Sequence, residues 1–146
     1  MVTDSESRFD ELFSALKQRN FRLTPQRIEL VRLIAASDGH PNAAEFYARI
    51  KRQFPTISPA TVYKTLALLK EMDQVLEIDL HGDSHYDGKR PFSHPHLICI
   101  QCGKISDTQE DLDRSPIVRI EDTTGYKIIR TQVSYFGLCP ECQSAA

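Results

Sequence analysis

The first half of the chain carries apolar residues at helical spacing in four successive segments. Residues 6–19 contain apolar side chains at positions i, i+3, i+4 and i+7, which predicts an amphipathic helix. Each of the next three segments begins with a residue that commonly caps a helix, twice followed by proline at the first helical position. These starts are Thr24-Pro25, Asn42 and Ser58-Pro59. The pattern therefore predicts four helices.

The pattern changes after the fourth helix. Residues 75–80 alternate apolar and polar side chains, as in a half-buried strand. Gly82-Asp83 is a turn signal, so residues 84–87 are expected to return as a second strand. Helices followed by a two-stranded hairpin are the order of a winged helix, in which the last helix enters the major groove of DNA. We predict a DNA-binding domain over residues 1–87 and a second domain over residues 88–146.

The distribution of charge agrees with this interpretation better than the net charge does. The whole chain has a net charge of −2, but residues 17–70 contain ten Lys or Arg against three Asp or Glu, a net charge of +7. Such a segment can neutralise phosphates, but on charge alone solvated helix faces are the more common explanation. The expected DNA contacts are Arg22, Ser58, Ala60, Thr61, Tyr63 and Lys64, with Thr65 as a further candidate.

The chain has four cysteines, arranged as two CxxC pairs, Cys99/Cys102 and Cys139/Cys142. Two such turns can form a tetrahedral thiolate cage around Zn²⁺, with Zn–S distances of about 2.3 Å. Because all four ligands come from the protein, the ion would have a structural role and its binding energy would stabilise the fold. The alternatives are two dithiol redox switches, which would make the cysteines the sensor, or four inert core thiols.

A second group of candidate ligands consists of histidines and aspartates. His94 and His96 are two positions apart on an extended segment and project to one side, Asp87 precedes them, and Asp107 follows them. His40 lies in the turn before the third helix. Three nitrogens and two oxygens suit Fe²⁺, Mn²⁺ or Zn²⁺ better than Mg²⁺ or Ca²⁺, although each histidine alone is more commonly a surface residue.

An enzymatic alternative uses fewer of these residues. A zinc hydrolase would activate water with a metal held by His94, His96 and Asp107. The chain has no HExxH motif or comparable general-base spacing, so we do not expect an enzyme. The chain also has no apolar run of about 18 residues and no signal-peptide pattern, which predicts a cytoplasmic protein without a membrane span, with reduced thiols.

Several of these motifs together resemble a known family. The segments are RLTPQR (22–27), DGHP (38–41), FP-x-IS-x-ATVY (54–63), HPHLICIQCGKISD (94–107) and FGLCPEC (136–142). In order, and from about residue 8 to 142, they closely resemble the ferric uptake regulator (Fur) family of bacterial repressors. The resemblance implies an α+β chain: a winged helix followed by a small α/β dimerisation domain with a three-stranded antiparallel sheet. It also implies a homodimer on a palindromic, A·T-rich operator, a four-cysteine zinc and a second, regulatory metal at the domain junction.

The regulatory ligands indicate a branch of the family. His40, Asp87, His94, His96 and Asp107 match the three-His, two-Asp set of the peroxide-responsive (PerR-like) regulators. Iron-sensing members usually have Glu where Asp107 stands. In the peroxide branch, bound Fe²⁺ reacts with H₂O₂ and a ligand histidine is oxidised, matching His40 or His94 here, whereas Mn²⁺ supports DNA binding without that reaction. The alternative within the family is an iron- or zinc-responsive uptake repressor without peroxide sensing.

Overall fold

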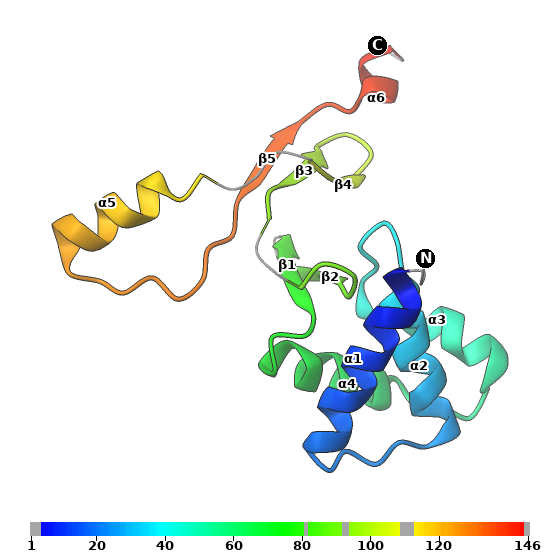
Figure 1. The fold of residues 1–146 in the computed structure, drawn as a ribbon. Coiled ribbons are helices and arrows are strands. Elements are labelled where there is room, and N and C mark those ends of the chain that lie inside the picture. The colour runs from blue at the N-terminus through cyan, green and yellow to red at the C-terminus, as the bar shows by residue number, and fades with distance from the viewer. Residues whose placement is uncertain (1–3, 81, 92–93, 109–112, 145–146) are drawn as a thin grey trace. The chain divides into compact units, whose positions relative to one another are not determined.

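The computed structural model describes residues 4–80, 82–91, 94–108 and 113–144. The chain divides into two compact units, Met1–Phe92 and Ser93–Ala146 (Figure 1). The first unit has the order α1 (Asp4–Gln18), α2 (Pro25–Ala36), α3 (Ala43–Gln53), α4 (Pro59–Glu71), β1 (Leu76–Leu80) and β2 (Asp83–Asp87). Among the described residues, no helix has the length and apolar character that a membrane span requires.

The N-caps expected from the sequence are present at α2, α3 and α4. In each case the side-chain oxygen accepts a hydrogen bond from the backbone N–H three residues further on, a group that has no partner within the helix. The pairs are Thr24 with Arg27 (3.4 Å), Asn42 with Glu45 (2.8 Å) and Ser58 with Thr61 (3.3 Å). The predicted helix starts are therefore confirmed.

The core of the first unit lies between the four helices and the hairpin. α1 packs on α2 and α4, α3 packs on α2 and α4, and β1 pairs antiparallel with β2. The side chains with no solvent exposure are almost all aliphatic, and burial of each contributes roughly 1.5–3 kcal/mol. They include Leu12, Leu16, Leu30, Val31, Ile34, Phe46, Ile50, Val62, Leu66 and Leu69.

A buried arginine ties α1 to both ends of the hairpin. Arg8 donates from Nε to the carbonyl oxygen of Gly88 (2.9 Å) and from Nη2 to that of Gln74 (2.7 Å). It also pairs with Glu11 on its own helix. Gly88 lies directly against the backbone of Ile34 in α2, where a Cβ would be 2.4 Å from the carbonyl oxygen. The chain just after β2 is thus held from two sides.

The second unit contains a small mixed sheet. Its elements are β3 (His96–Cys99), β4 (Ile105–Asp107), α5 (Ser115–Thr124), β5 (Ser134–Gly137) and α6 (Pro140–Ser144). The strand order is β4-β3-β5; β3 pairs antiparallel with β4 but parallel with β5. The expectation of three strands is confirmed, and the expectation that all are antiparallel is corrected. β5 follows a long connection through α5, which allows a parallel pairing that a tight turn cannot make.

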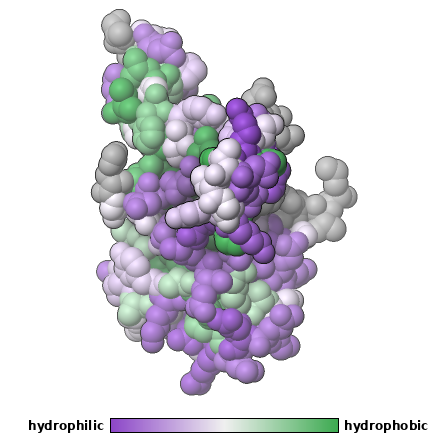
Figure 2. Space-filling model, turned by 90° about the vertical axis from the view of Figure 1, so that its left-hand side faces the viewer, coloured by the Kyte–Doolittle hydropathy of each residue, from purple (hydrophilic) through white to green (hydrophobic). Residues whose placement is uncertain are grey.

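Much of the apolar surface of the second unit faces solvent, as Figure 2 shows from one side. None of the residues of α5 is buried. The exposed large hydrophobic side chains of this unit are Leu97, Ile100, Val118, Ile120, Tyr126, Ile129, Tyr135, Phe136 and Leu138. Exposed apolar side chains in such number are typical of a protein–protein interface.

Candidate metal centres and nucleic-acid interface

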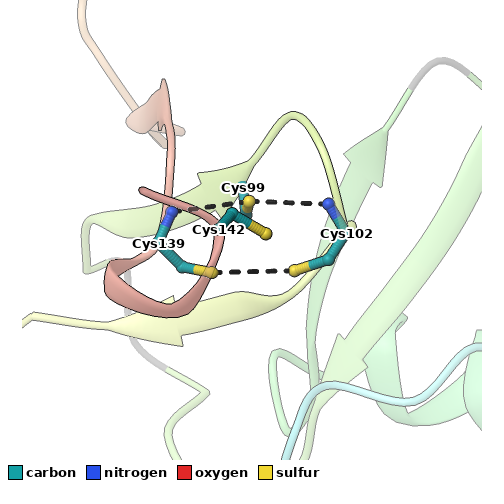
Figure 3. A group of neighbouring side chains, drawn as sticks. All are labelled: Cys99, Cys102, Cys139 and Cys142. Atoms are coloured by element: carbon teal, nitrogen blue, oxygen red, sulfur yellow. Dashed lines mark hydrogen bonds between the residues drawn. The ribbon is translucent and has the colours of Figure 1, made fainter. Parts of the chain in front are cut away.

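The four cysteines converge in the second unit (Figure 3). Cys99 ends β3, Cys102 lies in the following turn, Cys139 precedes α6 and Cys142 lies within it. The parallel pairing of β3 with β5 brings the two CxxC segments together, since Cys99 is the register partner of Gly137. Four sulfur atoms, one from each residue, all lie within 4.8 Å of one another. This arrangement fits a single tetrahedral metal ion.

Hydrogen bonds favour a thiolate at one corner of this cluster. The Cys99 Sγ accepts the backbone N–H groups of Cys102 (3.5 Å) and Cys139 (3.4 Å), which lower the pKa of its thiol to about 6. The thiol of Cys142 is affected in the opposite sense: its hydrogen bond with Cys139, and then burial, raise its pKa to about 12. Four sulfurs this close repel one another as thiolates, and a bound cation removes that repulsion. The donor set therefore fits Zn²⁺.

Three of the predicted regulatory ligands lie side by side in the second unit. His96 in β3 is the register partner of Asp107 in β4. The Asp107 Oδ1 is 3.1 Å from the Nε2 of His94 and 3.5 Å from the Nε2 of His96. The two imidazole rings are 4.4 Å apart between centroids. Two nitrogens and one carboxylate thus converge at the edge of the sheet.

The other two predicted ligands lie together in the first unit. The His40 Nε2 is 3.4 Å from the Oδ2 of Asp87, and both side chains are buried. The second carboxylate oxygen, Oδ1, accepts the backbone N–H groups of Lys89 (3.0 Å) and Arg90 (2.9 Å), forming an Asx turn at the end of β2. Each unit therefore carries its own subset of the five predicted ligands.

The exposed side of α4 carries the residues expected to contact DNA. Ala60, Tyr63 and Lys64 are exposed and Thr61 is half-buried, while Val62, Leu66 and Leu69 face the core. Arg22 and Ser58 are also exposed. Thr65 is fully buried and donates to the carbonyl oxygen of Thr61 (2.7 Å), so the suggestion that it contacts DNA was wrong.

The end of α4 is tied to the hairpin through one carboxylate. The Lys70 Nζ donates to the Glu77 Oε1 at 2.6 Å, and the Tyr86 hydroxyl donates to the Glu77 Oε2 at 3.4 Å. Burial, together with the nearby charge of Glu77, raises the pKa of Tyr86 to about 12, so this hydroxyl remains a donor at neutral pH. The candidate recognition helix and the wing are thereby held in one orientation within the unit.

Sequence reasoning missed two residues that support the candidate ligands. Arg8 was not singled out, because its partners are 66 and 80 residues away. His85 was not singled out either, yet its ring contacts the backbone of His40. A signal for His85 was present, since a residue two positions before Asp87 in a strand faces the same side of the sheet.

Comparisons with known proteins agree on one family. The family model described as "Ferric uptake regulator family" matches residues 18–136. The peroxide-responsive repressor PerR of Staphylococcus aureus is 34% identical over 143 residues, covering 97% of this chain and 96% of that protein. The structure of the Helicobacter pylori ferric uptake regulator superposes with a TM-score of 0.75 over 95% of this chain and 93% of that one, at 23% identity. A zinc uptake regulator complexed with zinc and DNA superposes with a TM-score of 0.72 at 25% identity, covering 99% and 98% of the two chains.

Proposed function

The chain belongs to the ferric uptake regulator family and is a metal-responsive repressor rather than an enzyme, and from this premise we propose that it senses hydrogen peroxide through a metal-bound histidine. The proposal names five regulatory ligands, His40, Asp87, His94, His96 and Asp107. The observation that carries it is the aspartate at position 107: its side chain is shorter than that of glutamate, and its Oδ1 lies 3.1 Å from the His94 Nε2.

The chemistry of the donor set supports a redox-active metal at this site. Three imidazole nitrogens and two carboxylate oxygens suit Fe²⁺ and Mn²⁺, and five ligands leave a position open on an ion that accepts six. We propose that one ion binds the pair from the first unit, His40 and Asp87, together with the trio from the second. Binding would then lock the DNA-binding unit to the dimerisation unit, so that affinity for DNA depends on the metal.

The peroxide response would consume a ligand. Bound Fe²⁺ would supply the chemistry that transfers one oxygen atom of H₂O₂ to an imidazole ring while the other leaves as water. The chain's contribution is to hold the rings of His40 and His94 beside the bound metal. Asp87 and Asp107 would orient these rings. An oxidised ring is a poorer ligand, so the metal would be released and the repressor would leave DNA.

We propose a separate, structural role for zinc on Cys99, Cys102, Cys139 and Cys142. The support is the convergence of the four sulfurs, whose ligand atoms lie within 4.8 Å of one another. Cys99 lies on the same strand as His96. Zinc bound there would fix the turn between β3 and β4 and so hold His96 opposite Asp107.

The proposed regulator acts in the cytoplasm as a homodimer on a palindromic, A·T-rich operator. Support for the dimer comes from the exposed apolar side chains of the second unit, which a second copy would cover. Support for DNA binding comes from the exposed side of the capped helix α4 and from the basic character of residues 17–70. Arg22, Ser58, Ala60, Thr61, Tyr63 and Lys64 are the proposed contacts.

Mass spectrometry of the Fe²⁺-loaded protein after mild H₂O₂ treatment tests the peroxide proposal. We expect one added oxygen atom on His40 or His94, and no such change in the Mn²⁺-loaded control. Unmodified histidines together with cysteine disulfides would instead identify the thiols as the sensor.

The variant Asp107→Glu distinguishes peroxide sensing from iron- or zinc-responsive uptake control. We expect it to keep metal-dependent DNA binding and to lose most of the histidine oxidation, because the longer side chain moves the carboxylate relative to His94. If the variant is oxidised as fast as the parent protein, Asp107 gives no reason to choose the peroxide branch. DNA affinity that is unchanged when the regulatory metal is removed would refute the proposed function as a whole.

A further inference from the structure

The ring of His85 lies between the loop that carries His40 and the carboxylate of Asp83 on its own hairpin. Its Nδ1 is 2.7 Å from the carbonyl oxygen of His40. A carbonyl oxygen only accepts hydrogen bonds, so Nδ1 is the donor. Its Nε2 is 3.0 Å from the Oδ2 of Asp83, at the start of the same strand. His85 is therefore oriented by Asp83 while it holds the backbone of His40.

The other end of this arrangement is fixed by a helix cap. The Asp83 Oδ1 accepts from the Nδ2 of Asn42 at 3.5 Å, and the Asn42 Oδ1 caps α3 by accepting the N–H of Glu45 at 2.8 Å. Asn42 also forms an isolated β-bridge with His85. The segment that carries His40 is thus joined to β2 by a single bridge and by side-chain contacts on both sides of it.

The loop at His40 needs such support because its backbone is unusual. His40 has φ of 56° and the preceding Gly39 has φ of 77°, so two successive residues adopt the left-handed conformation. A residue with a Cβ adopts this conformation only where its surroundings impose it. In the described structure, hydrogen bonds from β2 hold this loop: the His85 ring donates to the His40 carbonyl, and the Tyr86 N–H donates to the Pro41 carbonyl (3.0 Å).

The alternation of β2 makes His85 and Asp87 act on the same residue. Side chains two positions apart in a strand project to one side of the sheet, so both point toward the His40 loop. His85 contacts the His40 backbone, and the Asp87 Oδ2 is 3.4 Å from the His40 Nε2. The hydrogen bond from His85 fixes the position of the His40 main chain, whereas Asp87 contacts the His40 ring.

We propose that His85 is a positioning residue that sets the direction of the His40 imidazole toward the regulatory metal, without binding the metal itself. The inference rests on the proposed function, in which His40 is a ligand. Outer groups that orient a ligand commonly change metal affinity by about 10–100-fold when they are removed. Loss of the Nδ1 donor is therefore expected to weaken metal binding through His40 alone.

Two isosteric substitutions separate the two hydrogen bonds of the ring. In His85→Asn, the amide nitrogen occupies roughly the place of Nδ1 and can still donate to the His40 carbonyl. In His85→Gln, the amide nitrogen corresponds to Nε2, so the contact with Asp83 is kept and the contact with His40 is lost. His85→Leu removes both contacts at similar volume.

The test is a Mn²⁺ titration of the full-length protein with Zn²⁺ on its cysteines, alongside the Co²⁺ absorption spectrum of the same variants. We expect His85→Asn to remain within about twofold of the parent, and His85→Gln and His85→Leu to bind Mn²⁺ at least about tenfold more weakly, with an altered Co²⁺ spectrum. In the metal-free protein, hydrogen exchange over residues 38–44 should be faster in His85→Gln than in His85→Asn.

The variant His40→Ala separates failure of this inference from failure of the proposed function. If His40→Ala binds Mn²⁺ like the parent, His40 is not a ligand and the proposed function fails. If His40→Ala weakens binding but His85→Gln does not, the positioning role is refuted. It is refuted equally if His85→Asn binds as weakly as His85→Gln. The Asn and Gln variants keep the comparison decisive even if His85→Leu fails to fold.

Discussion

Replacing Gly88 with alanine tests how tightly the chain is held where it leaves β2. The new Cβ would lie 2.4 Å from the carbonyl oxygen of Ile34 and 2.7 Å from its Cγ2. The carbonyl belongs to the backbone of α2, so the contact is relieved only if the helix or the strand end moves. Either movement also pulls the Gly88 carbonyl away from the Nε of Arg8, now 2.9 Å away.

The expected cost follows from these two effects. Overpacking a filled site costs about 1–3 kcal/mol, and weakening a hydrogen bond to a charged group adds roughly another 1 kcal/mol. We therefore expect the free energy of unfolding of the first unit to fall by about 2–4 kcal/mol. For a unit of this size, that corresponds to a drop of roughly 10–20 °C in Tm.

Urea denaturation followed by circular dichroism measures this change, and Gly82→Ala is the matched control. Gly82 lies in the hairpin turn with φ of 89° and open space around its Cβ, so alanine there costs only the left-handed strain of about 1–2 kcal/mol. Because Gly88→Ala also disturbs the Arg8 contact, the substitutions Gly88→Ala and Arg8→Met should be less than additive. A cost below about 2 kcal/mol for Gly88→Ala, which is the upper end expected for Gly82→Ala, or strict additivity with Arg8→Met, would refute the reasoning.

Three further changes follow from the contacts already described. Arg8→Met should lower the free energy of unfolding by about 3 kcal/mol in urea denaturation, because the buried carbonyl of Gly88 and the part-buried carbonyl of Gln74 lose their donor; a change below about 1 kcal/mol contradicts this. Ser58→Ala should cost about 1 kcal/mol and weaken operator binding in a gel-shift assay, while Ser58→Gly costs only a few tenths; equal costs would show that the cap is not responsible. Cys142→Ala should abolish tight zinc binding, measured with a colorimetric chelator, and unfold the second unit while α1–α4 stay helical by circular dichroism; retained zinc would rule out the four-cysteine cage.

The first unit could be predicted from its sequence because local signals decide it. Thr24, Asn42 and Ser58 each cap the helix that they precede, and the alternation over residues 75–80 gives β1. In these segments the periodicity and the cap chemistry specify the same element, and tertiary packing agrees with both.

The second unit was less predictable because its sheet depends on a distant pairing. No turn signal links β3 to β5, and the hydrogen bond from the N–H of Ile100 to the carbonyl of Gly137 joins residues far apart in the chain. α5 has no buried residues in the described chain, so its apolar positions do not indicate what they pack against. The direction of β5 could not be derived from periodicity, which is the same for parallel and antiparallel strands.

The candidate ligands were recognisable from residue type and spacing, whereas their supporting contacts were not. The two CxxC pairs are visible in the sequence from the spacing of the four cysteines, and their sulfurs do converge. Arg8 and His85, in contrast, act through backbone carbonyl groups, which every residue has and which no motif records. A residue of any type can accept a hydrogen bond at its backbone carbonyl, so such a bond leaves no pattern in the sequence.

The Asx turn at Asp87 has a consequence for the size of ion that this residue can accept. Its Oδ1 is already committed to the N–H groups of Lys89 and Arg90, so the carboxylate can offer a metal one oxygen, Oδ2, on the side of His40. Calcium favours six to eight oxygens and often takes both oxygens of a carboxylate. Because Asp87 can offer only one oxygen, its geometry disfavours large ions such as calcium. This selection does not depend on how strongly the ion binds the histidine nitrogens.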